Sequence, residues 1–167
     1  RASRASRPAI VAGRMGHPQS RYPQAVWDSA YEAMPLTYDP STLRFAPLLR
    51  ELLPGGGSAF EVGCFPGDYL IFLARELGYR PCGIDVTPFV ETRLPARLAE
   101  QGIVEHGLVR GSFFDLDDAE QHDVVCSFGF VEHFDDVEDV LARHVRLVRP
   151  GGWLVVTCPN FRGVQHG

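Results

Sequence analysis

Two acidic residues, each at the end of a short apolar run, have the spacing of a nucleotide site. Glu61 ends the first run and is followed by Gly63, Gly67 and an amphipathic helix-like pattern, and Asp85 ends a second run at 81–84. Glycines let the backbone come close to a ligand, and a carboxylate after the second strand can accept hydrogen bonds from two ribose hydroxyls. This order of strand, glycine loop, helix, strand and acid predicts a nucleotide-binding crevice.

Further candidates follow the later strand-like runs. Ser112 and Phe113 come after the third run, and Ser127 begins a loop after the fourth that contains Glu132 and His133. Ligands of open parallel sheets sit beyond the carboxyl ends of the strands, so we expect one common site. His133 can take a proton from a substrate hydroxyl, with Glu132 beside it. The alternative is that this pair fixes the loop or packs under the next helix.

Segment 58–160 resembles a class I S-adenosylmethionine-dependent methyltransferase. The run ExGxFxG at 61–67 is similar to the family's first motif, E/D-x-G-x-G-x-G, and Asp85 matches its ribose-binding acid. Segments 123–133 and 149–156 are similar to its fourth strand with the following loop and to the turn into its fifth strand. The resemblance implies methylation of a small molecule, with S-adenosyl-L-homocysteine as product. It implies that S-adenosyl-L-methionine contacts Glu61, Gly63, Cys64, Phe65, Gly67, Asp85, Val86, Ser112, Phe113 and Ser127.

The chain departs from the family pattern at two positions. Phe65 stands where a second glycine is usual, which predicts a negative φ there or a ring turned away from the ligand. Ser112 stands where many relatives carry the acid that meets the adenine amino group, and Asp115 is an alternative source of that acid. The backbone N–H of Phe113 can meet a ring nitrogen.

The acid at Glu61 favours a cationic sulfonium cofactor, because the same turn in a dinucleotide enzyme receives an anionic pyrophosphate. Glu61 can also bond backbone N–H groups of the loop, and Asp85 can cap a helix beginning near Pro88. Two other functions stay open: a nicotinamide-dependent oxidoreductase, and a non-catalytic partner subunit that binds S-adenosylmethionine. The chain has no N/D-P-P-Y/F run, which disfavours methylation of exocyclic amines of DNA bases.

Composition narrows the class of protein. The 167 residues suit one domain, and the formal charge of -5 argues against nucleic acid as a partner. No apolar run reaches the length of a membrane helix. The four cysteines form no C-x-x-C pair, so we expect no metal site and reduced, packing thiols in a cytoplasmic protein.

The rest of the pattern predicts an α/β fold, a Rossmann-like, doubly wound and mainly parallel sheet with helices on both faces and N-terminal helices before it. We expect a flexible arginine-rich arm at 1–19, a helical lid at 20–54 and the cofactor-binding core at 55–167. Trp27, Ala30, Tyr31 and Met34 form an apolar helical face. Strands are expected at 58–62, 80–84, 104–110, 123–128 and 153–158. Helices are expected at 41–53, 67–77, 88–101 and 136–148, with a kink or split at Pro95 and a cap at Asp135 or Asp136.

The last expected strand would leave an open apolar edge. We therefore expect that the protein extends past Gly167, or that a second copy or a partner chain covers this strand.

Overall fold

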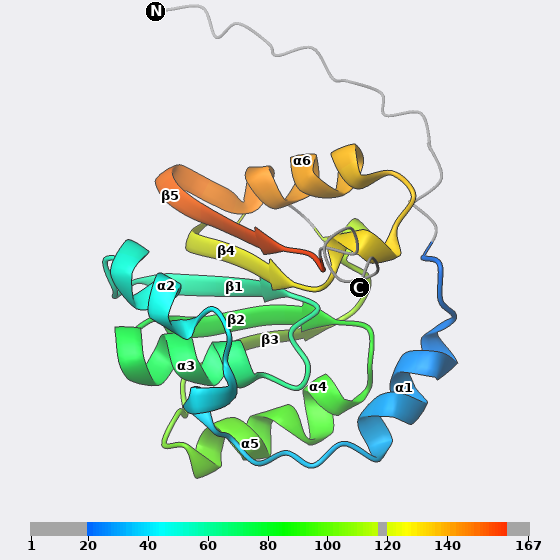
Figure 1. Ribbon diagram of the computed structural model, residues 1–167, viewed down its shortest axis with the longest axis horizontal. Coiled ribbons are helices and arrows are strands. Elements are labelled where there is room, and N and C mark those ends of the chain that lie inside the picture. The colour runs from blue at the N-terminus through cyan, green and yellow to red at the C-terminus, as the bar shows by residue number, and fades with distance from the viewer. Residues whose placement is uncertain (1–19, 117–119, 160–167) are drawn as a thin grey trace, which may run out of the picture.

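The computed structural model describes residues 20–116 and 120–159 and contains one five-stranded sheet, all of whose strands are parallel. The strand order is β3-β2-β1-β4-β5. The strands are β1 (Ser58–Val62), β2 (Arg80–Asp85), β3 (Gly107–Arg110), β4 (His122–Phe128) and β5 (Val148–Thr157). The order reverses between β1 and β4, and such a switch point opens a crevice at the carboxyl ends of the strands. The predicted Rossmann-like fold is confirmed (Figure 1).

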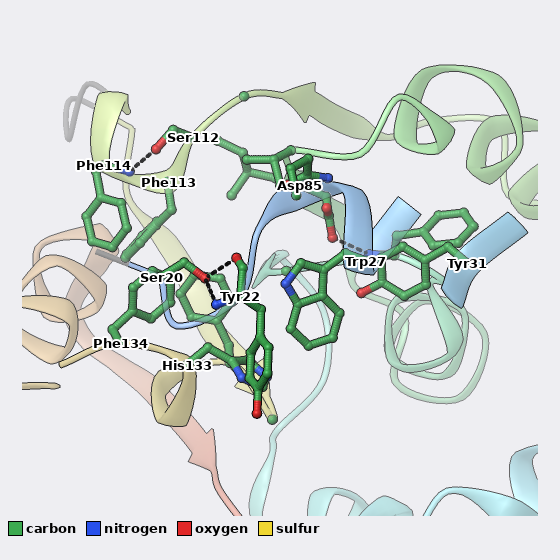
Figure 2. Close-up of a pocket in the computed structure, with 18 of the residues that line it drawn as sticks. Ser20, Tyr22, Trp27, Tyr31, Asp85, Ser112, Phe113, Phe114, His133 and Phe134 are labelled. Atoms are coloured by element: carbon green, nitrogen blue, oxygen red, sulfur yellow. Dashed lines mark hydrogen bonds between the residues drawn. The ribbon is translucent and has the colours of Figure 1, made fainter. Parts of the chain in front are cut away.

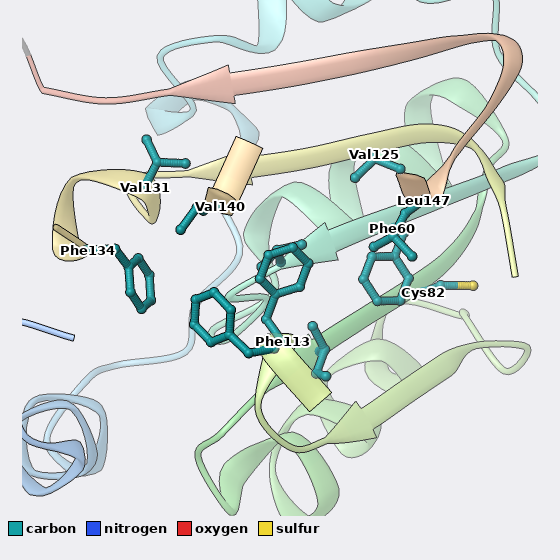
Figure 3. Packing of buried hydrophobic residues seen from close by; sticks show 11 residues of the cluster. Phe60, Cys82, Phe113, Val125, Val131, Phe134, Val140 and Leu147 are labelled. Carbon is teal, nitrogen blue, oxygen red and sulfur yellow. The ribbon is translucent and has the colours of Figure 1, made fainter. Parts of the chain in front are cut away.

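Alternation along the strands gives the sheet an apolar core on each face. Val125 belongs to a cluster that contains Phe60, Phe113 and Val140 (Figure 3). Its neighbour Val124 belongs to a different cluster, which includes Phe72. Both faces of the sheet are therefore covered, as near-continuous apolar strands require.

The helices that follow the strands begin and end close to the expected positions. They are α3 (Asp68–Leu77), α4 (Phe89–Thr92), α5 (Leu94–Glu100) and α6 (Val137–Leu147). Pro95 falls in the first turn of α5, so the expected 88–101 helix is split, as predicted. The Asp136 side chain accepts from the Asp139 amide and caps α6, also as predicted. Two expected strands differ: the third begins only at Gly107, and the fifth already at Val148.

The N-terminal segment differs more from the expectation. The expected 41–53 helix is a 3₁₀ turn at Pro40–Thr42 followed by α2 (Ala46–Leu52). Pro47 has no N–H to donate and fits only the first turn of a helix, so α2 starts next to it. Helix α1 (Gln24–Glu32) contains Trp27, Ala30 and Tyr31 of the expected helical face but ends before Met34, so that part of the prediction is wrong. None of its residues is buried, and Ala30 is exposed.

Helix α1 lies beyond the arrowheads of the strands, apart from the sheet (Figure 1). No helix in the described ranges is long and apolar enough to cross a membrane. The arm expected at 1–19 lies outside the described residues.

Candidate active site

A cavity of about 390 Å³ opens at the carboxyl ends of β1, β2 and β4. The sheet side of its wall comes from the strand ends and the turns after them. The other side comes from the segment before and within α1. The cavity is lined by Ser20, Tyr22, Gln24, Trp27, Tyr31, Gly63, Phe65, Ile84, Asp85, Val86, Gly111, Ser112, Phe113, Phe114, Phe128, Gly129, Phe130, His133 and Phe134.

Asp85, the last residue of β2, lines the cavity and bonds the backbone around it. Its carboxylate accepts one hydrogen bond from the Phe65 amide over 3.1 Å and another from the Thr87 amide over 3.0 Å. The residue is only 8% exposed, and burial raises the pKa of the Asp85 carboxyl above its usual value. It does not cap α4, whose first turn receives no side-chain cap bond. A carboxylate has about four acceptor positions, so these bonds leave Asp85 capacity to accept from a ligand hydroxyl.

Gly63 lines the cavity in a conformation that favours glycine. Its φ is +71°, and a Cβ atom here would lie 2.8 Å from Cδ2 of Phe130. The missing side chain therefore lets the Phe130 ring approach the loop.

Phe65 is compatible with the loop because its φ is not positive, one of the two outcomes expected. Its ring is 3% exposed and lines the cavity. It packs against the Tyr31 ring at a centroid distance of 4.9 Å and against Phe89 at 5.5 Å. An aromatic ring of the loop thus joins it to α1.

Four of the expected cofactor contacts lie behind the wall. Glu61, Cys64, Gly67 and Ser127 do not line the cavity. Glu61, Cys64 and Ser127 are buried. Gly67 has a φ of +94°, and a Cβ atom there would collide with Cδ1 of Leu94. Close packing of α5 on the loop therefore explains this glycine directly.

The buried Glu61 carboxyl accepts a hydrogen bond from the Leu70 amide. Its Oε2 has no hydrogen-bond partner among the described residues. Burial raises the pKa of Glu61 well above its usual value, and the nearby carboxylates Asp68 and Asp85 add to this. The neutral carboxylic acid is thus favoured at this position.

Ser112 and Phe113 line the cavity at the turn after β3. The Ser112 hydroxyl accepts from the Phe114 amide over 3.2 Å and begins the 3₁₀ turn Phe113–Asp115. Val86, which is 43% exposed, lines the same part of the cavity. Asp115 is exposed and does not line it, so this residue is not placed as the substitute acid.

His133 closes the opposite part of the cavity (Figure 2). Its ring lies 4.7 Å from the Trp27 ring and 5.7 Å from the Tyr22 ring, both edge to face. Glu132 does not line the cavity, and its Oε1 lies 4.0 Å from Nε2 of His133, beyond hydrogen-bond distance. Of the expected acid–base pair, only His133 reaches the ligand space.

Sequence reasoning missed several wall residues. Ile84, Gly111, Phe128 and Phe130 follow from the strand-end rule that identified Asp85. The N-terminal residues Ser20, Tyr22 and Gln24 carry no local signal. For Trp27 and Tyr31 the sequence indicates only an apolar face, because helical spacing does not tell a core from a cavity wall.

The charge of the cavity is low. Within residues 20–116 and 120–159, Asp85 is the only lining residue of the charged types Asp, Glu, Lys and Arg. No cluster of three metal-ligating side chains occurs in the described part of the chain. The four cysteines are free; three are buried, and Cys158 is exposed, contrary to a packing role there.

Comparisons with known proteins agree with this geometry. Residues 60–154 match the model of a methyltransferase domain. The chain is 30% identical over 136 residues to the ubiquinone biosynthesis O-methyltransferase of Thiobacillus denitrificans; the match covers 80% of this chain but only 57% of that relative. A similar relative from Burkholderia multivorans is 28% identical over 135 residues, with 80% and 57% covered.

A solved S-adenosylmethionine-dependent methyltransferase of Thiobacillus denitrificans, in complex with S-adenosyl-L-homocysteine, shares the fold. It has a TM-score of 0.62 and 23% identity, with 80% of this chain and 55% of that one covered. The family match at 60–154 includes the glycine loop and Asp85. Because the matching family is one of methyltransferases, the chain does not belong to a family of nicotinamide-dependent oxidoreductases. The chain therefore belongs to the methyltransferase domain family, that of the class I S-adenosylmethionine-dependent methyltransferases.

Proposed function

We propose that the protein transfers a methyl group from S-adenosylmethionine to a small, uncharged acceptor. The observation that carries this proposal is the single cavity in which Asp85, a ribose-type acceptor, lies across from His133, a candidate base. The cofactor comes from the family and from the solved relative with bound S-adenosylhomocysteine.

The cofactor would occupy the part of the cavity next to the sheet. Asp85 would accept from the ribose through its remaining acceptor capacity, and Ser112, Phe113 and Val86 would contact the base. Gly63 and Phe65 would border the methionine part. Glu61, Cys64, Gly67 and Ser127 would act from behind the wall by holding the loop, with Glu61 contributing negative charge when it ionises.

The acceptor would occupy the part bounded by Tyr22, Trp27, His133 and Phe134. Among the described residues no arginine or lysine lines the cavity, so there a carboxylate or phosphate on the acceptor would lose its hydration without gaining a partner. Aromatic walls instead suit a flat apolar molecule. The relatives named as ubiquinone biosynthesis O-methyltransferases favour a hydroxyl as the accepting group.

The sulfonium of the cofactor supplies an already reactive methyl group, so the protein's main work is alignment. The rings of α1 would exclude water and orient the acceptor. His133 would take the hydroxyl proton at a ring nitrogen, and Glu132, 4.0 Å from Nε2, would stabilise the resulting imidazolium.

A methyl-transfer assay tests this proposal. The whole protein is incubated with S-adenosylmethionine carrying a deuterated methyl group and with matched pairs of acceptors, a neutral phenol and the same phenol bearing a carboxylate. We expect label in the neutral member of a pair only. Label in the carboxylated member alone would contradict the acceptor class, and no transfer to any acceptor would favour the alternative of a non-catalytic binding subunit.

Three further proposals concern the whole protein. The chain spans 57% of the length of the relatives it matches. We propose that a second copy or a partner chain covers β5, where Trp153 is 40% exposed and Leu154 37%. We propose a cytoplasmic protein, which the four free thiols support.

We also propose that 20–54 acts as a lid over the core at 55–167.

A further inference from the structure

Helix α1 carries two rings of the cavity wall but little of the core: of its residues, only Tyr31 packs against a buried cluster, the one that contains Phe65. None of its residues is buried. Trp27 and Tyr31 lie one helical turn apart and both line the cavity, with ring centroids 6.2 Å apart. One partly buried ring stabilises the position of α1 only weakly, so we expect polar contacts at its end to contribute as well.

Arg93, at the junction of α4 and α5, supplies such contacts. Its Nη1 donates to the Tyr31 carbonyl over 2.8 Å, and its Nη2 donates to the Met34 carbonyl over 3.3 Å. Tyr31 lies in the last turn of α1 and Met34 two residues beyond the helix, and the carbonyl end of a helix favours a cation. The guanidinium also lies 5.9 Å from the centroid of the Phe65 ring, which packs on Tyr31.

Arg97, one turn further along α5, joins the next residues of the N-terminal segment to the glycine loop. Its Nε donates to the Leu36 carbonyl over 3.2 Å. Its Nη1 donates to the Pro66 carbonyl, and its Nη2 donates to the Asp68 carboxylate over 2.5 Å. Arg97 is only 3% exposed, and charge-assisted bonds in such a site are stronger than at the surface.

We propose that Arg93 and Arg97 are positioning residues that hold the Trp27–Tyr31 wall against the cofactor loop. Neither lines the cavity, so they act through other residues. Phe65 is the point where the two sides meet. Its ring contacts Tyr31, and its amide donates to Asp85. A shift of α1 is therefore expected to disturb both the glycine loop and Asp85. That the ligand of this loop is S-adenosylmethionine rests on the proposed function.

The test uses Arg93→Gln, since Arg97 is buried and its replacement risks unfolding. The whole protein is labelled with 5-fluorotryptophan, and the fluorine resonances of Trp27 and Trp153 are assigned from Trp27→Phe and Trp153→Phe. In Arg93→Gln the Trp27 resonance should move toward that of free fluorotryptophan. The Trp153 resonance, on β5, should stay. Calorimetry should show S-adenosylhomocysteine binding weakened by about tenfold.

Arg50→Gln is the matched control. Arg50 also makes two hydrogen bonds, both to Glu76, and its guanidinium lies 5.1 Å from the Phe72 ring. It joins α2 to α3 away from the cavity, so its loss should leave the Trp27 resonance and the affinity unchanged. Arg93→Lys should restore part of both signals, because one ammonium can still reach a carbonyl.

The outcomes separate the two proposals. An unmoved Trp27 resonance with unchanged affinity in Arg93→Gln would overturn the positioning role. Movement of Trp153 as strongly as Trp27 would do so too, because the effect would then be general loss of structure. A wild-type protein that does not bind S-adenosylhomocysteine would refute the proposed function, while the fluorine shift alone would still decide whether Arg93 places α1.

Discussion

The carboxylate of Asp85 accepts a hydrogen bond from the backbone amide of Phe65 over 3.1 Å, and so ties the end of β2 to the loop after β1. The same carboxylate accepts from Thr87. The residue proposed to hold the ribose is therefore also the residue that shapes the glycine loop. Substitutions at Asp85 should change binding and stability together.

Asp85→Ala removes two backbone hydrogen bonds and the proposed ribose contacts. We expect a loss of about 1–3 kcal/mol in unfolding free energy and at least about tenfold in affinity for S-adenosylhomocysteine. Calorimetry with a 2′,3′-dideoxyribose analogue separates the two roles. The analogue should bind wild type more weakly than S-adenosylhomocysteine does, and the two ligands should bind the variant alike. Equal discrimination by wild type and Asp85→Ala would show that the carboxylate only shapes the loop.

Gly67 should matter for stability more than for binding. Its φ of +94° disfavours any side chain, and a Cβ atom would collide with Leu94. We expect Gly67→Ala to cost about 1–3 kcal/mol more in unfolding free energy than Gly78→Ala. Gly78 is the matched control, because its φ is +70° but nothing lies within 4 Å of its Cβ position.

The Leu94→Ala background sharpens this measurement. Removing the Leu94 side chain should abolish most of the difference between the two glycine variants, as a double-mutant cycle measured by chemical denaturation. Equal costs for Gly67→Ala and Gly78→Ala in the wild-type background would exclude the collision.

Glu61 should make stability depend on pH. Because its pKa is raised in the folded state, the folded protein holds this proton at pH values where the unfolded chain has lost it. Its contribution is therefore fully present below the usual value of 4.5 and is lost as pH rises through the folded pKa. A tenfold difference in proton affinity between the folded and unfolded states corresponds to about 1.4 kcal/mol.

Glu61→Gln removes this titration and keeps the shape of the side chain. We expect the melting temperature of the variant relative to wild type to increase from about pH 5 to about pH 8. A difference that stays constant over this range would mean that Glu61 ionises alike in both states.

His133 should affect turnover more than cofactor binding. His133→Asn removes the proposed base, and we expect methyl transfer to slow by about 100-fold or more at saturating cofactor. Affinity for S-adenosylhomocysteine should stay within about threefold. His106→Asn, at an exposed site away from the cavity, should change neither value. Full activity of His133→Asn would show that His133 is not the base, and that the protein accelerates transfer only by aligning the acceptor with the methyl group.

The sheet could be predicted from the sequence because each strand is a short apolar run bounded by turn-forming residues. The position of Asp85 followed from the same pattern, as did the cap at Asp136 and the helix break at Pro95. These features depend on residues close together in the chain. The start of β5 at Val148 was missed, because Pro150 and Gly151 read as a turn although the structure continues the strand through them.

The contacts between distant segments could not be predicted. In the sequence, Arg93 and Arg97 are two polar residues of the expected 88–101 helix with no signal of their own, and only the fold brings them to carbonyls of the N-terminal segment. The placement of Glu61 behind the wall depends in the same way on the packing of α3. Trp27 could be assigned to an apolar face, but not to a cavity, since both produce the same spacing.

Binding of the cofactor itself tests the central claim most directly. Calorimetry of the whole protein with S-adenosylhomocysteine and, separately, with NAD compares the two ligands that this type of sheet can hold. The account predicts S-adenosylhomocysteine binding with a Kd of about 1 μM, or about -8 kcal/mol, and no comparable signal for NAD. NAD binding tighter than S-adenosylhomocysteine would contradict it.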